Sequence, residues 1–246
     1  MNPALPPFAE AALLLDLDGT LIDLAPTPDS VVVPAGLAAD LRRLRERLGG
    51  ALAILSGRPV AAVDALLPDV AWAVSGEHGA ALRAAPAASL TRADLPSPPP
   101  AWRARAAELV AAHPGALLEE KARGFVLHFR RVPAAGAALR EGIAPLVAGD
   151  PRFELMTTAM GWEVRPRGVD KGTALRAVMA LPPFAGRRPL FIGDDVTDRD
   201  AIAAALSLGG AGLLVDDLFG DAAGVRAWLA AAAATGAWPG FTRSPG

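Results

Sequence analysis

The sequence contains no cysteine among its 246 residues. Disulfide bridges, thiolate zinc sites and cysteine nucleophiles are therefore excluded, and we expect the protein in a reducing cytoplasm. The chain also has no long basic run, and its formal net charge is only -2. Because binding to nucleic acid or to an anionic membrane depends on positive charge, we expect neither partner and favour a small molecule instead.

No segment is typical of a signal peptide or a membrane span. The first 20 residues lack a basic opening, and prolines and then two aspartates interrupt their apolar run. The run AWLAAAAATGAW at residues 227–238 is too short to cross a bilayer and indicates an ordinary terminal helix. With 52% hydrophobic and 20% charged residues, the composition is that of a folded globular protein. We expect a monomer, with a weak homo-oligomer as the alternative.

Five short apolar runs, each bounded by Gly, Asp or Ser, predict strands of a parallel sheet that is buried on both faces. These runs lie at 12–15, 51–55, 72–74, 190–192 and 213–215. Between the first two, leucines recur at helical spacing in residues 34–49, and further helices are predicted at 59–68 and 171–181. The expected fold class is α/β, with a doubly wound, mostly parallel, Rossmann-like sheet.

The middle of the chain has a different pattern, which begins after the proline-rich stretch at residues 95–102. Because proline runs are extended, this stretch predicts a connector. Beyond it, the pattern predicts a helix, a strand pair, a second helix and a second strand pair. We therefore expect a small α+β domain inserted at about residues 83–164, with residues 1–82 and 165–246 forming the body.

Polar clusters lie at the expected ends of elements of the body. They are DLDGT from Asp16, LSGR at 55–58, Lys171, and GDDVTD at 193–198. The carboxyl ends of strands in an open α/β sheet face one crevice, so we expect these clusters to meet there. Asp16 and Asp18 are two residues apart, a spacing that can direct both carboxylates into the crevice.

Carboxylates that lie close together repel one another unless a cation separates them. The oxygens of Asp16, Asp194 and Asp195 suit a hard ion, and Mg²⁺ is the expected cofactor. Such an ion attracts a phosphoryl group, while Ser56 and Lys171 supply a hydroxyl donor and a positive charge for its oxygens. The sequence therefore predicts a phosphate site that contains Mg²⁺.

A simpler interpretation of DLDGT is a turn with an aspartate cap, which is the commoner meaning of an isolated Asp-Gly pair. A chance match to D-x-D-G-T in a chain of this length is on the order of one in several hundred. Taken alone, Ser56 would more often be a loop hydroxyl, and Lys171 a solvated lysine at a helix start. The order and placement of all four clusters favour the functional interpretation.

Taken in order, DLDGTL, LSGR, Lys171 and GDDVTD resemble the four motifs of the haloacid dehalogenase superfamily. Within it, the chain resembles trehalose-6-phosphate phosphatases in GEHG at 76–79, LEEKARGFVLHFR at 118–130, WEVRPRGVDKGTAL at 162–175 and GDDVTDRDAI at 193–202. The resemblance spans nearly the whole chain. It implies a haloacid dehalogenase-like catalytic core whose inserted cap closes over the site and selects the sugar. The implied reaction is hydrolysis of trehalose 6-phosphate to trehalose and phosphate.

The resemblance also implies a mechanism. Asp16 would attack phosphorus and form an aspartyl phosphate, which splits one difficult displacement into two easier ones. Asp18 would first protonate the leaving sugar oxygen and then accept a proton from the hydrolytic water. Ser56 and Lys171 would hold the phosphoryl oxygens and stabilise their charge.

Metal and substrate ligands are implied in the same way. Mg²⁺ would bind the carboxylates of Asp16 and Asp194 and the backbone carbonyl of Asp18, with Asp195 and Asp198 in support. The residues implied to bind substrate are Gly57, Arg58, Glu77, His78, Gly79, Glu119, Lys121, His128, Arg130, Glu163 and Arg165. Without the resemblance, the alternating polar residues of FVLHFR would indicate only a half-exposed strand.

Two positions depart from the family's usual pattern. Arg199 stands where the family commonly has glutamate, so a supporting role beside the metal motif is expected of Asp198 and not of Arg199. Phe129 stands where the family commonly has tyrosine, which keeps the ring and loses a hydroxyl. Neither position belongs to the residues expected to carry out the phosphoryl transfer.

Other functions are compatible with these motifs. The nearest is the same hydrolysis of another sugar phosphate, such as sucrose phosphate or mannosylglycerate phosphate, because such phosphatases share the body and a similar cap. A sugar-phosphate mutase would pass the phosphoryl group to a second sugar, which product analysis would reveal. A non-catalytic sugar-phosphate sensor is a third alternative, although a sensor has little need for a complete nucleophile, acid-base, lysine and metal set.

Overall fold

The computed structural model describes residues 3–25, 30–121, 123–158 and 160–241. The chain divides into two compact units, which are described separately. The first unit combines Met1–Ala93 with Val169–Gly246, and the second is Asp94–Gly168.

A seven-stranded sheet in the order β11-β10-β1-β2-β3-β4-β5 is the centre of the first unit. Its strands are β1 (Ala11–Leu15), β2 (Leu52–Leu55), β3 (Ala73–Gly76), β4 (Ala81–Arg83), β5 (Thr91–Arg92), β10 (Arg188–Gly193) and β11 (Ala211–Leu214). The five predicted strands, β1, β2, β3, β10 and β11, pair in parallel, whereas β4 and β5 pair antiparallel. The expected α/β fold with a mostly parallel sheet is confirmed.

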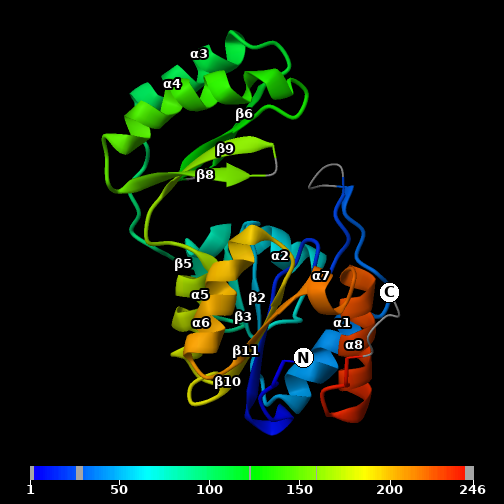
Figure 1. The fold of residues 1–246 in the computed structure, drawn as a ribbon. Coiled ribbons are helices and arrows are strands. Elements are labelled where there is room, and N and C mark those ends of the chain that lie inside the picture. The colour runs from blue at the N-terminus through cyan, green and yellow to red at the C-terminus, as the bar shows by residue number, and fades with distance from the viewer. Residues whose placement is uncertain (1–2, 26–29, 122, 159, 242–246) are drawn as a thin grey trace. The chain divides into compact units, whose positions relative to one another are not determined.

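Helices cover both faces of this sheet. They are α1 (Leu37–Arg47), α2 (Val60–Leu66), α5 (Lys171–Met179), α6 (Arg199–Ser207), α7 (Val215–Leu218) and α8 (Ala222–Thr235). Figure 1 shows α5 beside α6 on one side of the sheet and α1 beside α8 on the other. Leu37, Leu41 and Leu44 of α1 are buried, as their helical spacing predicts, and every residue of β1 and β2 is buried between the two helical layers.

The division of the chain differs from the predicted boundaries. The strands β4 and β5 extend the sheet of the first unit beyond β3, so the chain leaves this unit after Ala93 and not after residue 82. The chain returns at Val169, after β9 has ended at Pro166. The sequence pattern did not reveal β4 and β5 because these strands contain only three and two residues.

The second unit packs two helices on one face of a four-stranded antiparallel sheet in the order β6-β7-β9-β8 (Figure 1). Its elements are α3 (Pro100–Ala111), β6 (Leu117–Lys121), β7 (Gly124–His128), α4 (Gly136–Ala148), β8 (Phe153–Thr158) and β9 (Gly161–Pro166). This order confirms the predicted helix, strand pair, helix and strand pair. A separate core, which includes Trp102, Phe125, Leu127, Leu139 and Phe153, joins the helices to the sheet.

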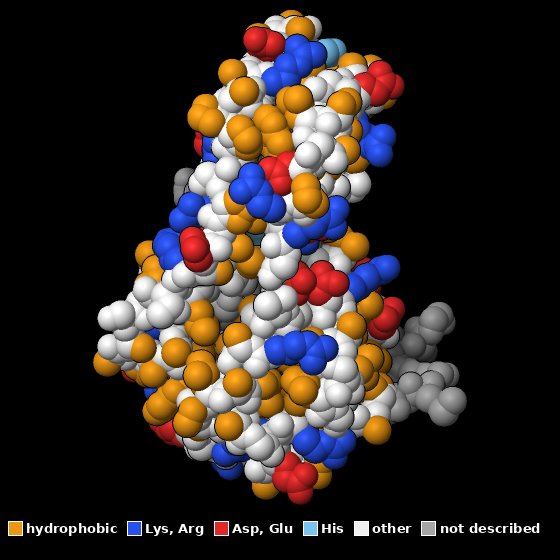
Figure 2. Space-filling model, turned by 90° about the vertical axis from the view of Figure 1, so that its left-hand side faces the viewer, with side chains coloured by type: hydrophobic (Ala, Val, Ile, Leu, Met, Phe, Trp, Pro, Cys, Tyr) orange, Lys and Arg blue, Asp and Glu red, His pale blue; other side chains and the backbone are white. Residues whose placement is uncertain are grey.

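Within the described ranges, no helix combines the length and the apolar character that crossing a membrane requires. On the face shown in Figure 2, basic and acidic side chains are interspersed among hydrophobic ones and do not gather by sign. This mixture agrees with the formal net charge of -2.

Candidate active site

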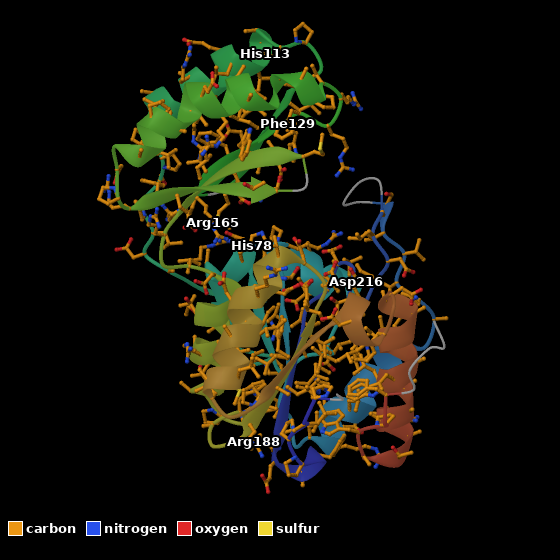
Figure 3. The ribbon with its side chains drawn as sticks, viewed as in Figure 1. His78, His113, Phe129, Arg165, Arg188 and Asp216 are labelled. Carbon is orange, nitrogen blue, oxygen red and sulfur yellow. The ribbon has the colours of Figure 1, made fainter. Side chains whose placement is uncertain are left out.

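The parallel strands bring several predicted site residues to one end of the sheet in the first unit. Asp16 directly follows β1, and its N–H donates to the C=O of Ile192 on β10 at 2.9 Å. Ser56 follows β2, which pairs with the edge of β1 opposite to β10. His78 and Asp216 lie at the same end of the sheet in Figure 3. Asp16 and Ser56 therefore lie at the carboxyl ends of the strands, where the crevice of an open α/β sheet is expected.

Lys171 lies at the start of α5 between two carboxylates. Its Nζ donates to Oδ1 of Asp16 and to Oδ1 of Asp198, both at 2.6 Å, and none of these residues is more than 4% exposed. Burial alone would lower the pKa of Lys171, but the two carboxylates outweigh it and raise that pKa to about 12. The ammonium group is therefore charged at neutral pH. Asp170 fixes the start of the helix by accepting a hydrogen bond from the N–H of Thr173 at 2.6 Å.

Three carboxylates crowd together around this lysine. Oxygens of Asp16, Asp194 and Asp198 all lie within 4.8 Å of one another. Burial raises the pKa of Asp16 well above its usual value, although Lys171 opposes this effect, and burial together with nearby Asp198 raises the pKa of Asp194. When all are ionised, three carboxylates and one ammonium group leave two negative charges unbalanced. The charge and the oxygen donors fit a hard divalent cation.

The contacts of Asp198 and Asp195 indicate supporting roles. While Oδ1 of Asp198 accepts from Lys171, its Oδ2 accepts the N–H groups of Asp194 and Asp195, each at 3.0 Å. Asp195 is exposed, and its Oδ1 accepts the N–H of Val196 at 2.6 Å. Asp198 therefore connects Lys171 with the backbone that positions Asp194, and Asp195 caps the turn that follows. That either binds the metal directly stays a prediction.

Thr20 belongs to this site, although we did not predict a role for it. The residue is fully buried, and its Oγ1 donates to Oδ1 of Asp194 at 3.3 Å. Its neighbour Gly19 has a φ of 78°, and a Cβ there would lie 2.0 Å from Oδ2 of Asp194. The segment that carries Asp16 thus also orients Asp194. The available signal was the threonine within DLDGT itself.

Replacing Gly19 with alanine is expected to weaken Mg²⁺ binding by roughly 10- to 100-fold, because the new methyl group would displace the Asp194 carboxylate. Isothermal titration calorimetry with Mg²⁺ measures this effect. Gly220→Ala is the matched control, since Gly220 has a φ of 79° and a Cβ there would meet open space within the described chain. Equal affinities in the two variants would contradict the expected role of Gly19.

The loop after β2 is held by the GEHG segment. Ser56 is buried, its Oγ accepts the N–H of Arg58 at 3.1 Å, and its C=O accepts the N–H of His78 at 3.1 Å. The C=O of Arg58 accepts the N–H of Glu77 at 3.0 Å. The ring of His78 lies against Gly57, where a Cβ would come within 2.6 Å of two ring atoms. The loop after β2 and the GEHG segment are therefore joined by backbone hydrogen bonds and packing.

Glu77 and His78 themselves have φ values of 54° and 55°, a left-handed conformation that non-glycine residues adopt rarely. The side chain of Glu77 is held by an ion pair. One guanidinium nitrogen of Arg92 lies 2.6 and 2.7 Å from its two carboxylate oxygens. Gly79 then packs against the carbonyl of Asp170, directly before the helix that carries the central lysine. The segment thus connects the loop after β2 with the start of α5.

The second unit places most of the remaining predicted residues on one face of its sheet. Directly paired residues of antiparallel strands share a face, and Phe125 and Leu127 point toward the helices, so the residues that alternate with them point away. The outward face carries a hydrogen-bonded contact of His128 with Glu119 at 2.6 Å and two ion pairs, Lys121 with Glu163 at 2.9 Å and Arg165 with Glu154 at 2.7 Å. Arg165 is labelled in Figure 3 on the side of this unit away from α3 and α4. Arg130 lies in the exposed turn after β7.

Comparison with known proteins identifies the family. Residues 14–213 match the family model described as trehalose-phosphatase. The chain belongs to the trehalose-phosphatase family. A relative from Sinorhizobium fredii, named probable trehalose-phosphate phosphatase, is 38% identical over 200 residues, which cover 81% of this chain and 75% of the relative. The trehalose-6-phosphate phosphatase of Escherichia coli is 37% identical over 205 residues, with 82% and 76% covered.

Solved structures show that this trehalose-phosphatase family member has the expected fold. The C-terminal domain of the C. albicans trehalose-6-phosphate phosphatase aligns with a TM-score of 0.73 at 20% identity, over 92% of this chain and 93% of that chain. A haloacid dehalogenase-like hydrolase from Bacteroides thetaiotaomicron aligns with a TM-score of 0.57 at 14% identity, over 79% and 85%. The resemblance inferred from the four motifs is therefore confirmed for the family and the fold.

Proposed function

We propose that this trehalose-phosphatase family member hydrolyses trehalose 6-phosphate to trehalose and phosphate through an aspartyl phosphate formed on Asp16. The main support is the buried contact of Asp16 with Lys171 at the end of β1, beside the carboxylate of Asp194. The curated relatives from Sinorhizobium fredii and Escherichia coli, which are named as trehalose-phosphate phosphatases, support the choice of sugar.

In the first half-reaction, a carboxylate oxygen of Asp16 forms a bond to phosphorus while the bond from phosphorus to the sugar oxygen breaks. Asp18 gives its proton to that leaving oxygen, so trehalose departs as an alcohol. Lys171 holds Asp16 by its Oδ1 and keeps a positive charge beside the transferred group. Ser56 offers its hydroxyl proton to a phosphoryl oxygen, because its Oγ already accepts the N–H of Arg58.

In the second half-reaction, a water molecule gives one proton to Asp18, which lost its own in the first, and forms a bond to phosphorus. The bond between phosphorus and the Asp16 oxygen then breaks, which releases phosphate and restores the carboxylate. Asp16 is only 4% exposed, so the protein and not bulk water surrounds the reacting group. The two steps leave both aspartates as they began.

The carboxylates that would hold Mg²⁺ are those of Asp16 and Asp194, together with the backbone carbonyl of Asp18. When bound, Mg²⁺ neutralises negative charge on the transferred oxygens. The fit rests on the clustered oxygens and on the raised pKa values of Asp16 and Asp194, since a buried carboxylate with a raised pKa gains from a nearby cation. Asp198 and Thr20 hold this arrangement through hydrogen bonds.

Sugar recognition is proposed for the outward face of the second unit's sheet. A disaccharide has many hydroxyl groups, and the three paired side-chain contacts on this face present both donors and acceptors for them. Glu163 is the most enclosed of the predicted carboxylates there, with 8% of the residue exposed. Glu154 joins this set because it pairs with Arg165, a contact that the sequence did not predict. Glu77, His78 and Gly79 are proposed substrate residues of the first unit.

A panel of sugar phosphates tests the proposed function. With Mg²⁺ present, we expect kcat/KM for trehalose 6-phosphate to exceed that for sucrose, mannosylglycerate and glucose phosphates by at least roughly tenfold, a ratio that one or two lost hydrogen bonds would produce. Activity should disappear with EDTA and return with added Mg²⁺. A tenfold preference for another sugar would overturn the assignment, and transfer of phosphate to a second sugar would indicate a mutase.

A further inference from the structure

We propose that Arg58 is a positioning residue for acid-base catalysis, because its guanidinium group fixes the direction of the Asp18 carboxylate. The Nε of Arg58 donates to Oδ2 of Asp18 and its Nη2 donates to Oδ1, both at 2.7 Å. The proposal rests on the acid-base role proposed above for Asp18. It assigns Arg58 a task that differs from contacting the substrate.

Bidentate pairing restricts the Asp18 side chain more than a single contact does. The terminal torsion of an aspartate is broad, so a carboxylate with one partner can rotate. Two parallel hydrogen bonds from a planar guanidinium group fix the plane of the carboxylate as well as its position. They use two of the four lone-pair positions of the carboxylate, which leaves the other two for the proton that Asp18 gives to the leaving oxygen. The Arg58 side chain is 15% exposed and that of Asp18 is 30% exposed, so solvent competes with the pair only in part.

The backbone of Arg58 is itself held on both sides. Its N–H donates to Oγ of Ser56 at 3.1 Å, and its C=O accepts the N–H of Glu77 at 3.0 Å. The backbone of Arg58 is therefore fixed within the loop, and its side chain extends from there to Asp18. Arg58 connects Ser56, which is expected to bind the phosphoryl group, with the carboxylate that is expected to protonate the leaving oxygen.

If the Asp18 carboxyl group loses its orientation, the effect on the rate should depend on the leaving group of the substrate. A sugar alcohol is a poor leaving group and needs a well-placed proton donor when its bond to phosphorus breaks. The p-nitrophenolate ion leaves without such help. The comparison uses kcat/KM, which covers the steps up to departure of the leaving group and excludes the second half-reaction that both substrates share. If Arg58 acts through Asp18, its removal lowers kcat/KM for a sugar phosphate much more than kcat/KM for p-nitrophenyl phosphate. If Arg58 instead binds the phosphoryl group, both substrates lose activity equally.

The test compares Arg58→Ala and Arg58→Lys with the wild-type protein on both substrates. We expect Arg58→Ala to lower kcat/KM for trehalose 6-phosphate by roughly 10- to 100-fold, and kcat/KM for p-nitrophenyl phosphate by less than about threefold. Arg58→Lys should lie between, since lysine cannot make the bidentate contact. Added guanidinium ion should restore part of the sugar-phosphate activity of Arg58→Ala.

Arg83→Ala is the matched control. Arg83 makes a similar pair with Asp64, at 2.9 Å, and its side chain is 14% exposed, but we assign it no catalytic role. This variant should retain both activities, which separates the loss of any enclosed arginine from the loss of Arg58. Thermal unfolding of each variant identifies a general loss of structure, and the Arg58→Lys variant keeps the cation if Arg58→Ala fails to fold.

Two further outcomes separate this proposal from the proposed function. Equal losses on both substrates in the Arg58 variants, or no loss on either, would overturn the positioning role while leaving the phosphatase assignment intact. Asp18→Asn should show the same dependence on leaving group without rescue by guanidinium. If Asp18→Asn lowered kcat/KM for both substrates equally, the role of Asp18 as the acid would fail, and the role proposed for Arg58 would fail with it.

Discussion

Asp16→Asn is expected to lower kcat for trehalose 6-phosphate by at least about 10⁴-fold, because an amide cannot act as the nucleophile that the mechanism requires. Asparagine keeps the size of the side chain and an oxygen that can accept from Lys171, which still contacts Asp198. The fold should therefore survive. Steady-state phosphate release measures the loss, and acid quenching with radiolabelled substrate should trap phosphate on the wild-type protein alone.

Asp94→Asn is the matched control for this experiment. Asp94 is exposed at the first residue of the second unit, so the same chemical change there should leave activity unaltered. Phosphate release by Asp16→Asn at the wild-type rate would contradict the covalent mechanism. Trapped phosphate on that variant would show that another residue is the nucleophile.

Lys171→Met is expected to destabilise the protein by about 3–5 kcal/mol at pH 7 without metal, since it leaves Asp16 and Asp198 buried without their shared cation. Chemical unfolding in urea measures the change. The variant should also lose most of its phosphatase activity at conditions where it is folded. Arg226→Met is the control: it removes a cation from Asp23, whose side chain is 66% exposed, and should cost about 1 kcal/mol or less.

The loss caused by Lys171→Met should shrink as the pH falls toward 5. In the wild-type protein, the raised pKa of Lys171 gives stability that is fully present below its ordinary value of 10.5 and is lost as pH rises through about 12. The lysine is therefore charged throughout this test. In the variant, Asp16 loses the cation that opposes burial, so the pKa of its carboxyl group lies further above that of the unfolded chain. The folded variant therefore takes up a proton as pH falls and gains stability. A loss independent of pH would point to altered packing instead.

The outline of the fold could be predicted from local patterns. The apolar runs that became β1 and β2 are buried at every residue, and a run of this kind has one stable place in an α/β protein, between two helical layers. The leucine spacing of α1 predicted its buried face, because helical side chains return to one face at a fixed period. The alternation of helices and strand pairs in the second unit was also predictable from local patterns. The strands β4 and β5 were too short to carry such a period.

The candidate site was predictable as a set of residues and not as a set of contacts. Asp16, Asp18, Ser56, Lys171 and Asp194 could be chosen from the sequence because motifs mark strand ends. Only the structure revealed the contacts. Lys171 donates hydrogen bonds to both Asp16 and Asp198, and Arg58 donates two to Asp18. Thr20 and Glu154 were missed for the same reason, since their partners stand elsewhere in the chain.

The sequence by itself determined the strand ends, the polar residues that follow them and, through the order of four motifs, the family. The tertiary structure decided which charges meet. Lys171 and Asp16 are 155 positions apart, and yet the Lys171 Nζ lies 2.6 Å from Asp16 Oδ1 because helix α5 begins near the carboxyl end of β1, which β10 and β2 flank in the sheet. Local sequence patterns indicate which residues are buried and which element they form. A contact between distant residues depends instead on the order of the strands and the packing of the helices, which the whole chain determines together.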